Sequence, residues 1–262
     1  MTDSTGIALR WLGTATVQLR FRDHELVFDP YLSRPAGARP PIGARPEELA
    51  AVSLILISHG HFDHAQGAAA VARITGAPVL APRATLPRLR REGVGETQLR
   101  ACEDHATIDW HGAPIRILPS RHIRFDVRLV VRTVLQVLRG GVAPKLLRLA
   151  SRYPMGSNSD FLLELGHERI LFSGSGGGDW NALAQLEPTT FLLPFAGRSD
   201  VVTYYLHALR RLRPRTVVLH HFDHFFPSFS IDYPVDELRS RMACELPDIR
   251  LVVPEPEQWL EL

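Results

Sequence analysis

The apolar positions of the first thirty residues recur in short runs that predict β-strands. Three runs, 7–13, 16–21 and 25–30, are rich in apolar and β-branched residues, and Gly13 and the polar segment 22–24 separate them. We expect a meander of strands that forms part of one sheet. The next segment, 34–47, is rich in proline, glycine and arginine, which predicts a loop.

A continuous apolar run at 52–58 is typical of a strand that is buried on both faces. The sequence HGHFDH follows it directly, and residues 65–75 then have a helix-forming composition that ends at 76–78. Another strand is expected at 77–82. Strand, histidine-rich loop and helix therefore follow one another as in a βαβ unit.

The second half of the chain repeats this alternation of apolar runs and helical patterns. A helix is expected at 201–212, and the segments 160–166 and 169–174 predict a hairpin. The other strands are expected at 114–120, at 189–195, from 216 onwards, and at 249–254 as the last strand of the chain. The pattern as a whole predicts an α/β protein.

Composition and charge narrow the class of protein. Of the 262 residues, 45% are hydrophobic and 22% charged, which is ordinary for a globular protein with a large core. We expect the whole chain, 1–262, to form a single domain. The net charge of +2 predicts no general attraction to nucleic acid, so no nucleic-acid partner is expected.

The cysteines and the N-terminal segment indicate the cellular compartment in which the protein is expected. Cys102 and Cys244 fit no zinc or redox spacing, and two unpaired thiols are typical of a reducing compartment. The N-terminal segment does not have the pattern of a signal peptide, and no run approaches the ~20 apolar residues of a membrane span. We therefore expect a cytoplasmic protein without a transmembrane segment.

Residues 121–152 form the most basic stretch of the chain, with eight basic residues and one acidic residue. Apolar residues recur between them at roughly helical spacing, which predicts a basic amphipathic helical insertion at about 123–153. Two interpretations stay open. The basic face is simply solvated, or the segment covers the mouth of a functional cleft and attracts anionic groups.

The sequence HGHFDH carries the clearest chemistry. It places His59, His61, Asp63 and His64 within six residues, directly after a buried strand. Imidazole and carboxylate groups are ligands for zinc, iron or manganese. The spacing therefore predicts a metal site, and Phe62 between the ligands is expected to pack in the core.

HGHFDH resembles the HxHxDH signature of the metallo-β-lactamase superfamily. The opening WLGTATVQLRF…LVFDPYL is similar to the branch that contains L-ascorbate-6-phosphate lactonases and N-acylphosphatidylethanolamine phospholipase D. The likeness covers nearly the whole chain. It implies a four-layer αββα sandwich, with metal ions held at one edge between the two sheets and with the basic segment as a helical insertion.

The resemblance also implies two sets of metal ligands. His59, His61 and His122 match the ligands of the first metal, and Asp63, His64 and His221 match those of the second. His220 is the alternative to His221, because both stand at the end of one predicted strand. Asp223 is a further candidate ligand.

One position departs from the family pattern. Members with two metals carry a bridging aspartate after a later strand, whereas this chain reads LFSGSGGGDW and has Ser175 there. Three outcomes are open: one tightly bound metal only, a carboxylate supplied by Asp223, or Asp179 reaching back through the glycines. Asp179 is more readily explained as a cap of the next helix.

The resemblance implies a hydrolase in which a metal-bound hydroxide attacks an ester, lactone or phosphodiester bond, with Asp63 orienting the hydroxide or acting as base. The basic segment favours an anionic small-molecule or lipid-like substrate. Zinc is the expected metal, as one or two ions, and iron or manganese are alternatives. The rival functions are an iron-dependent oxidoreductase of the same fold and a non-catalytic binding protein with a degenerate metal site.

Overall fold

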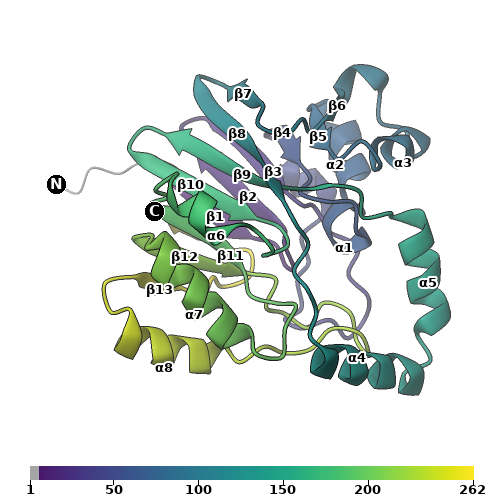
Figure 1. Ribbon diagram of the computed structural model, residues 1–262. Coiled ribbons are helices and arrows are strands. Elements are labelled where there is room, and N and C mark those ends of the chain that lie inside the picture. Colours follow the sequence, from purple (N-terminus) through teal and green to yellow (C-terminus); the bar gives the residue numbers. More distant parts are fainter. Residues whose placement is uncertain (1–5) are drawn as a thin grey trace.

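The computed structural model describes residues 6–262 and has four layers (Figure 1). Residues 1–5, which contribute to the expectation of no signal peptide, lie outside the described residues. Two seven-stranded sheets face each other, and helices cover the outer face of each sheet. The four-layer αββα sandwich expected from the sequence is confirmed.

Sheet one contains the N-terminal strands and the C-terminal strand. In spatial order its members are β14 (Trp259–Glu261), β1 (Ile7–Trp11), β2 (Val17–Phe21), β3 (His24–Phe28), β4 (Val52–Leu56), β5 (Val79–Ala81) and β6 (Leu99–Ala101). Pairing is antiparallel from β14 to β3 and parallel from β3 to β6.

Sheet two, like sheet one, has an antiparallel part and a parallel part. In spatial order its members are β13 (Arg250–Val252), β12 (Thr216–His220), β11 (Thr190–Pro194), β10 (Glu168–Ser173), β9 (Asn158–Leu165), β8 (Ala113–Ser120) and β7 (Thr107–Trp110). Pairing is antiparallel from β7 to β10 and parallel from β10 to β13.

The helices fall into three groups. Those behind sheet one are α1 (Phe62–Ala65), α2 (Ala68–Thr75) and α3 (Leu86–Arg91), with the 3-10 turns η1 (Pro46–Leu49) and η2 (Glu96–Gln98). Those behind sheet two are α6 (Trp180–Ala184), α7 (Val201–Leu212) and α8 (Val235–Glu245). The basic segment forms α4 (Val127–Arg139) and α5 (Ala143–Arg152), which stand apart from both groups in Figure 1.

The alternation of side chains along each strand separates the layers. Along β4, Leu54 and Leu56 pack between the two sheets, whereas Ile55 and the following Ile57 pack against the helices behind sheet one. All four side chains are buried, which explains why the run is continuously apolar rather than alternating.

Several strands end at one edge of the sandwich. The loops after β3, β4, β8, β10, β11 and β12 leave this edge: β3 and β4 run parallel, and β8, β10, β11 and β12 share one direction. The segment HGHFDH follows β4, and His122 and His221 follow β8 and β12. The fold thereby brings segments far apart in the chain to one place.

Two expectations about elements need correction. The segment 249–254 forms β13 but is not the last strand, because β14 follows it and pairs with β1. The helix expected at 65–75 is divided into α1 and α2 at Gly67, whose amide donates to the Pro30 carbonyl at 2.7 Å. A Cβ at Gly67 would lie 2.7 Å from that carbonyl oxygen, so only glycine allows this contact.

Within residues 6–262, no helix combines the length and the apolar character needed to cross a bilayer.

Candidate metal centre

The histidine-rich loop is held against the rest of the molecule by a close backbone contact. The Gly60 amide donates to the Met155 carbonyl at 2.7 Å. A Cβ at Gly60 would lie 2.1 Å from the Pro154 carbonyl oxygen, so this position of HGHFDH requires glycine. The loop then enters α1, which carries Asp63 and His64.

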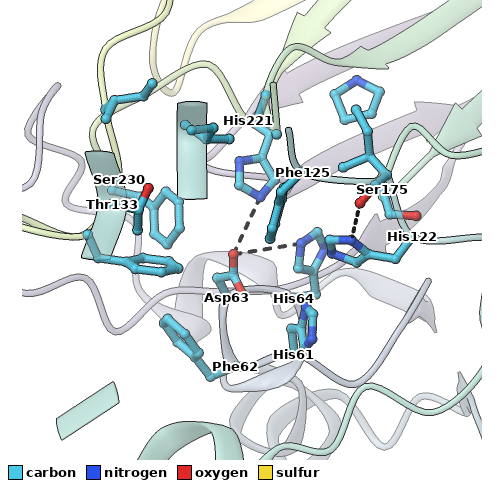
Figure 2. A pocket seen from close by; sticks show the side chains of 18 of the residues that line it. His61, Phe62, Asp63, His64, His122, Phe125, Thr133, Ser175, His221 and Ser230 are labelled. Carbon is cyan, nitrogen blue, oxygen red and sulfur yellow. Dashed lines mark hydrogen bonds and ion pairs between the residues drawn. The ribbon is translucent and has the colours of Figure 1, made fainter. Parts of the chain in front are cut away.

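Three histidines from two strand ends form the first group of candidate ligands, called here the three-histidine group. One ring nitrogen each of His59, His61 and His122 lies within 4.8 Å of the others. His59 Nε2 lies 3.1 Å from His61 Nδ1. The ring centroids of His61 and His122, both labelled in Figure 2, lie 5.0 Å apart.

A carboxylate and two histidines form the second group, called here the aspartate group. Ligand atoms of Asp63, His64 and His221 also lie within 4.8 Å of one another. Asp63 Oδ2 stands 3.4 Å from His221 Nε2 and 3.8 Å from His64 Nε2, and Figure 2 shows it between the two rings. The structure thus brings together all six residues that the sequence assigns to the two metals.

The other ring nitrogen of several candidate ligands is engaged, which leaves one nitrogen directed to the centre. His64 donates from Nδ1 to Asp29 Oδ2 at 2.7 Å, and His122 donates from Nδ1 to the Ile123 carbonyl at 2.9 Å. Such contacts fix the tautomer and the orientation of a ligating imidazole.

Asp29 is a functional candidate that the sequence analysis missed. Its carboxylate is buried and accepts from the Ser58 amide (2.7 Å), the Ser58 hydroxyl (2.6 Å) and His64. Because the Ser58 hydroxyl donates to Asp29, it accepts from His59 Nδ1, 3.0 Å away. One carboxylate therefore orients a histidine of each group.

The surroundings of Asp29 leave room only for glycine at position 174. A Cβ on Gly174 would lie 1.9 Å from Ser58 Oγ and 2.9 Å from Asp29 Oδ2. The sequence signal for Asp29 is its position directly after a buried strand, in the opening segment LVFDPYL. Its backbone φ of +44° shows that the chain turns sharply there.

Burial sets the protonation of the histidines. It lowers the pKa of His59 well below its ordinary value, that of His61 to about 4, and that of His122 in the same direction. These imidazoles are therefore neutral at neutral pH, with lone pairs available to a metal ion. For His64, burial lowers the pKa, but the carboxylates of Asp29 and Asp63 outweigh it and raise the pKa.

Asp63 is buried and ionised. Burial alone would raise its pKa, but His64 and His221 lower it below its usual range. Three neutral imidazoles in one group, and a carboxylate with two imidazoles in the other, are donor sets that suit a divalent transition-metal ion. The residues present therefore fit the metal that the motif implies.

The two neighbouring histidines at the end of β12, His220 and His221, point to different places. His221 is in the aspartate group, has a backbone φ of +58° and donates from its amide to the Thr14 carbonyl at 2.6 Å. His220 is buried, stacks on Phe172 and places Nε2 3.3 Å from the Leu192 carbonyl oxygen. The geometry favours His221 as the candidate ligand.

The structure does not bring Asp223 into either group. Its Oδ2 is buried and accepts from the Arg34 guanidinium at 2.6 Å and from the Thr14 amide at 3.2 Å. This ion pair fixes the loop that also holds His221. As a metal ligand, Asp223 stays a prediction.

Ser175, which the resemblance matches to an aspartate of related proteins, lines the same cavity as residues of both groups. It is buried, and its hydroxyl donates to the Arg121 carbonyl at 3.0 Å (Figure 2 shows its position). Asp179 caps α6, because its Oδ1 accepts from the amides of Asn181 and Ala182. The suggestion that Asp179 reaches back to the metals is therefore not supported.

A cavity of about 370 Å³ opens above the two groups. Its walls come from α4, α5 and the loops after β8, β11 and β12, and they are mostly apolar. Away from the metal ligands the large side chains of the lining are Phe62, Ile123, Phe125, Leu129, Val130, Val134, Leu146, Tyr153, Phe225, Phe229, Ile231 and Tyr233. No lysine or arginine is among the described residues that line it, so the cationic side chains of α4 and α5 lie outside the cavity.

The chain matches a known family model. The model described as "Beta-lactamase superfamily domain" matches residues 24–222. A protein of Thermoplasma acidophilum named a UPF0173 metal-dependent hydrolase is 28% identical over 219 residues, which are 82% of this chain and 83% of that protein. The match to a protein of the same name from Pyrobaculum calidifontis, 29% identical over 117 residues, covers 44% of this chain and only half of that protein.

A solved structure has a similar fold over nearly the full length of both chains. Igni18, described as a novel metallo hydrolase from the archaeon Ignicoccus hospitalis, superposes with a TM-score of 0.70 and 18% identity, covering 98% of each chain.

Proposed function

Because the chain belongs to the beta-lactamase superfamily, we propose that it is a metal-dependent hydrolase that binds one or two divalent ions, with zinc as the expected metal. One observation carries the proposal: the two groups of candidate ligands adjoin each other, with the His59 and His64 rings 3.9 Å apart, and five of the six residues line a single cavity. His59, His61 and His122 would hold one ion. Asp63, His64 and His221 would hold the other.

A bound divalent ion supplies a nucleophile at neutral pH and stabilises the charge that develops on a carbonyl or phosphoryl oxygen. The residues of the chain then position the reactants. Asp63 stays ionised and faces the cavity, so it orients the attacking water by accepting a hydrogen bond. Its lowered pKa makes it a weak proton acceptor, which favours orientation over general-base catalysis.

The proposed bond is an ester, a lactone or a phosphodiester. The apolar walls of the cavity support a substrate with an acyl or other apolar group beside that bond. An anionic substrate, in line with the lactonase and phospholipase D branch, draws support from the arginines of α4 and α5. These lie around the cavity rather than in its walls, so the anionic part of such a substrate would sit at the mouth or against the metals.

The proposed organisation is one domain over residues 1–262, with about 123–153 as an insertion. A cytoplasmic location is proposed as well. It is supported by Cys102 and Cys244, which are free thiols in the structure.

The proposal is tested with protein purified without added metal. We expect bound metal by elemental analysis, and chelator-sensitive hydrolysis of one class among matched ester, lactone and phosphodiester substrates. His59→Ala and His61→Ala should each lose tight metal binding at the three-histidine group, whereas His167→Ala, in an exposed turn, should not. Full retention of metal in both variants would contradict the proposed site.

Two results would point to the rival functions. Iron in the purified protein together with oxygen consumption would favour an oxidoreductase. Metal binding at both groups without hydrolysis of any of the three classes would favour a binding protein.

A further inference from the structure

The outer face of α4 carries a row of exposed apolar side chains. Val127, Val131, Leu135 and Leu138 recur at intervals of four, four and three residues, so they lie along one side of the helix. Between 45% and 79% of each side chain is exposed. Exposed apolar rows of this kind mark surfaces that contact a partner or a membrane.

Exposed basic side chains lie next to this row on α4: Arg128, Arg132 and Arg139. Three more exposed cations, Lys145, Arg148 and Arg152, lie on α5, where Lys145 stands over the Phe226 ring at 5.0 Å. None of the six forms an ion pair with a carboxylate among residues 6–262. The nearby acid, Asp126, accepts from the Leu129 amide and from Ser199, so its carboxylate caps the N-terminus of α4. The face therefore combines apolar contacts with uncompensated positive charge.

The apolar row is continuous with the cavity. Val130 and Val134 line the cavity and are themselves 43% and 49% exposed, so they form its rim next to the row. Phe125, just before α4, also lines the cavity and is half exposed. An apolar path therefore leads from the outer face of α4 to the metal centre.

We propose that the outer face of α4 docks on the surface of an anionic phospholipid bilayer. A basic amphipathic helix binds in the interface plane by burying its apolar face among the lipids while its cations meet the anionic head groups. Helix α4 has both features on one side. Docking there would turn the mouth of the cavity to the membrane.

The charges disfavour a second copy of the chain as the occupant. A two-fold symmetric contact through this row would bring the same patch of cations from each copy together. Like charges facing each other would oppose that contact, whereas an anionic membrane complements them.

The test is co-sedimentation of the metal-loaded protein with phosphatidylcholine vesicles, with and without phosphatidylglycerol. We expect binding to the anionic vesicles only, and weaker binding as salt rises, because salt screens exposed charges. Arg128→Gln combined with Arg132→Gln should reduce binding about 10- to 30-fold, since each cation contributes near an anionic surface. Leu135→Ser combined with Leu138→Ser should reduce it comparably.

Matched controls separate this face from the rest of the surface. Ile74→Ser on α2 removes an exposed apolar side chain, and Arg91→Gln on α3 removes an exposed cation, both on elements remote from α4 in Figure 1. Neither should change vesicle binding, and all variants should retain metal. Equal binding of wild type and the α4 variants, or no binding to anionic vesicles, would overturn the proposal. A dimer that the Leu135→Ser/Leu138→Ser variant converts to monomer would overturn it in favour of a second copy.

Discussion

Asp29 orients a histidine of each candidate ligand group through one carboxylate. It contacts His64 directly and reaches His59 through the Ser58 hydroxyl. A contact of this kind does not create a metal site, but it holds the ligands in the geometry that the metal requires. The strength of metal binding should therefore depend on a residue that touches no metal.

We expect Asp29→Asn to weaken metal binding about 10- to 100-fold, the loss typical when a group that orients metal ligands is changed. The amide keeps the shape of the carboxylate but does not accept from three donors at once. Chelator competition followed by elemental analysis would measure the effect. Asp179→Asn, at the cap of α6, is the matched control. Unchanged affinity in Asp29→Asn would show that the histidines hold their positions without it.

Ser175 leaves the two groups without a shared protein carboxylate. Two dications at the ~3.5–4 Å spacing of two-metal sites repel, and a bridging anion normally offsets this. We expect unequal affinities in the wild type. Ser175→Asp, which places a carboxylate in the cavity beside both groups, should raise the occupancy of the weaker position. A metal titration would measure both sites.

The control for this substitution is Ser175→Asn, which has the same size as the aspartate variant and no charge. Two equal, tight sites in the wild type, with no change in Ser175→Asp, would show that another group already bridges the metals.

At the scale of elements, strongly patterned segments were predictable from the sequence. The helix expected at 201–212 forms with those bounds as α7, and the apolar run at 52–58 contains β4. In contrast, β14 is only three residues long, and its pairing with β1 is a long-range contact that no local pattern reveals. The division of α1 from α2 likewise depends on the approach of Gly67 to Pro30.

The same distinction between local patterns and long-range contacts applies to the residues of the candidate site. His59, His61, Asp63 and His64 lie within six consecutive residues, so their chemistry is visible in the sequence itself. The assignment of His122 and His221 required a family resemblance, because only the sandwich brings their strand ends to this edge. Asp29 was missed since its role depends on the parallel pairing of β3 with β4, which places it beside Ser58.

Helix α4 has a cavity face and an outer face, and these should differ in their effect on ligand binding. We expect the metal-loaded protein to bind n-alkyl carboxylates about fourfold more tightly for each methylene that the cavity buries. Val134→Asn, on the cavity face, should flatten this dependence on chain length. Val131→Asn, on the outer face, should leave it unchanged. Calorimetric titration of a short series would show whether α4 forms the wall of the binding site.

At the scale of the whole molecule, the sandwich buries a carboxylate that belongs to neither metal group. Asp160 lies on β9, between β8 and β10 of sheet two, is 1% exposed and accepts from the Ser120 hydroxyl at 2.9 Å. Burial raises its pKa to about 7, although hydrogen bonds from Ser173 and Ser120 act in the opposite direction. The folded protein therefore keeps Asp160 protonated over a pH range in which the same carboxyl group is ionised in the unfolded chain.

This difference makes the free energy of unfolding depend on pH. The contribution of Asp160 is fully present below about pH 4, where the unfolded chain also binds the proton, and it is lost as pH rises through about 7. The difference between a pKa of about 7 and the ordinary value of 3.8 corresponds to roughly 4 kcal/mol. Asp160→Asn keeps the shape without the ionisation. The stability of the variant relative to wild type should therefore rise between pH 4 and pH 8, by on the order of 4 kcal/mol. Denaturant unfolding of both proteins across this pH range measures the difference in their free energies of unfolding. The titration of the histidines is common to both proteins and cancels in this difference. Asp248→Asn, at an exposed position, should show the same pH dependence of the free energy of unfolding as wild type. A parallel curve for Asp160→Asn would show instead that Asp160 is ionised in the fold and compensated by its neighbours.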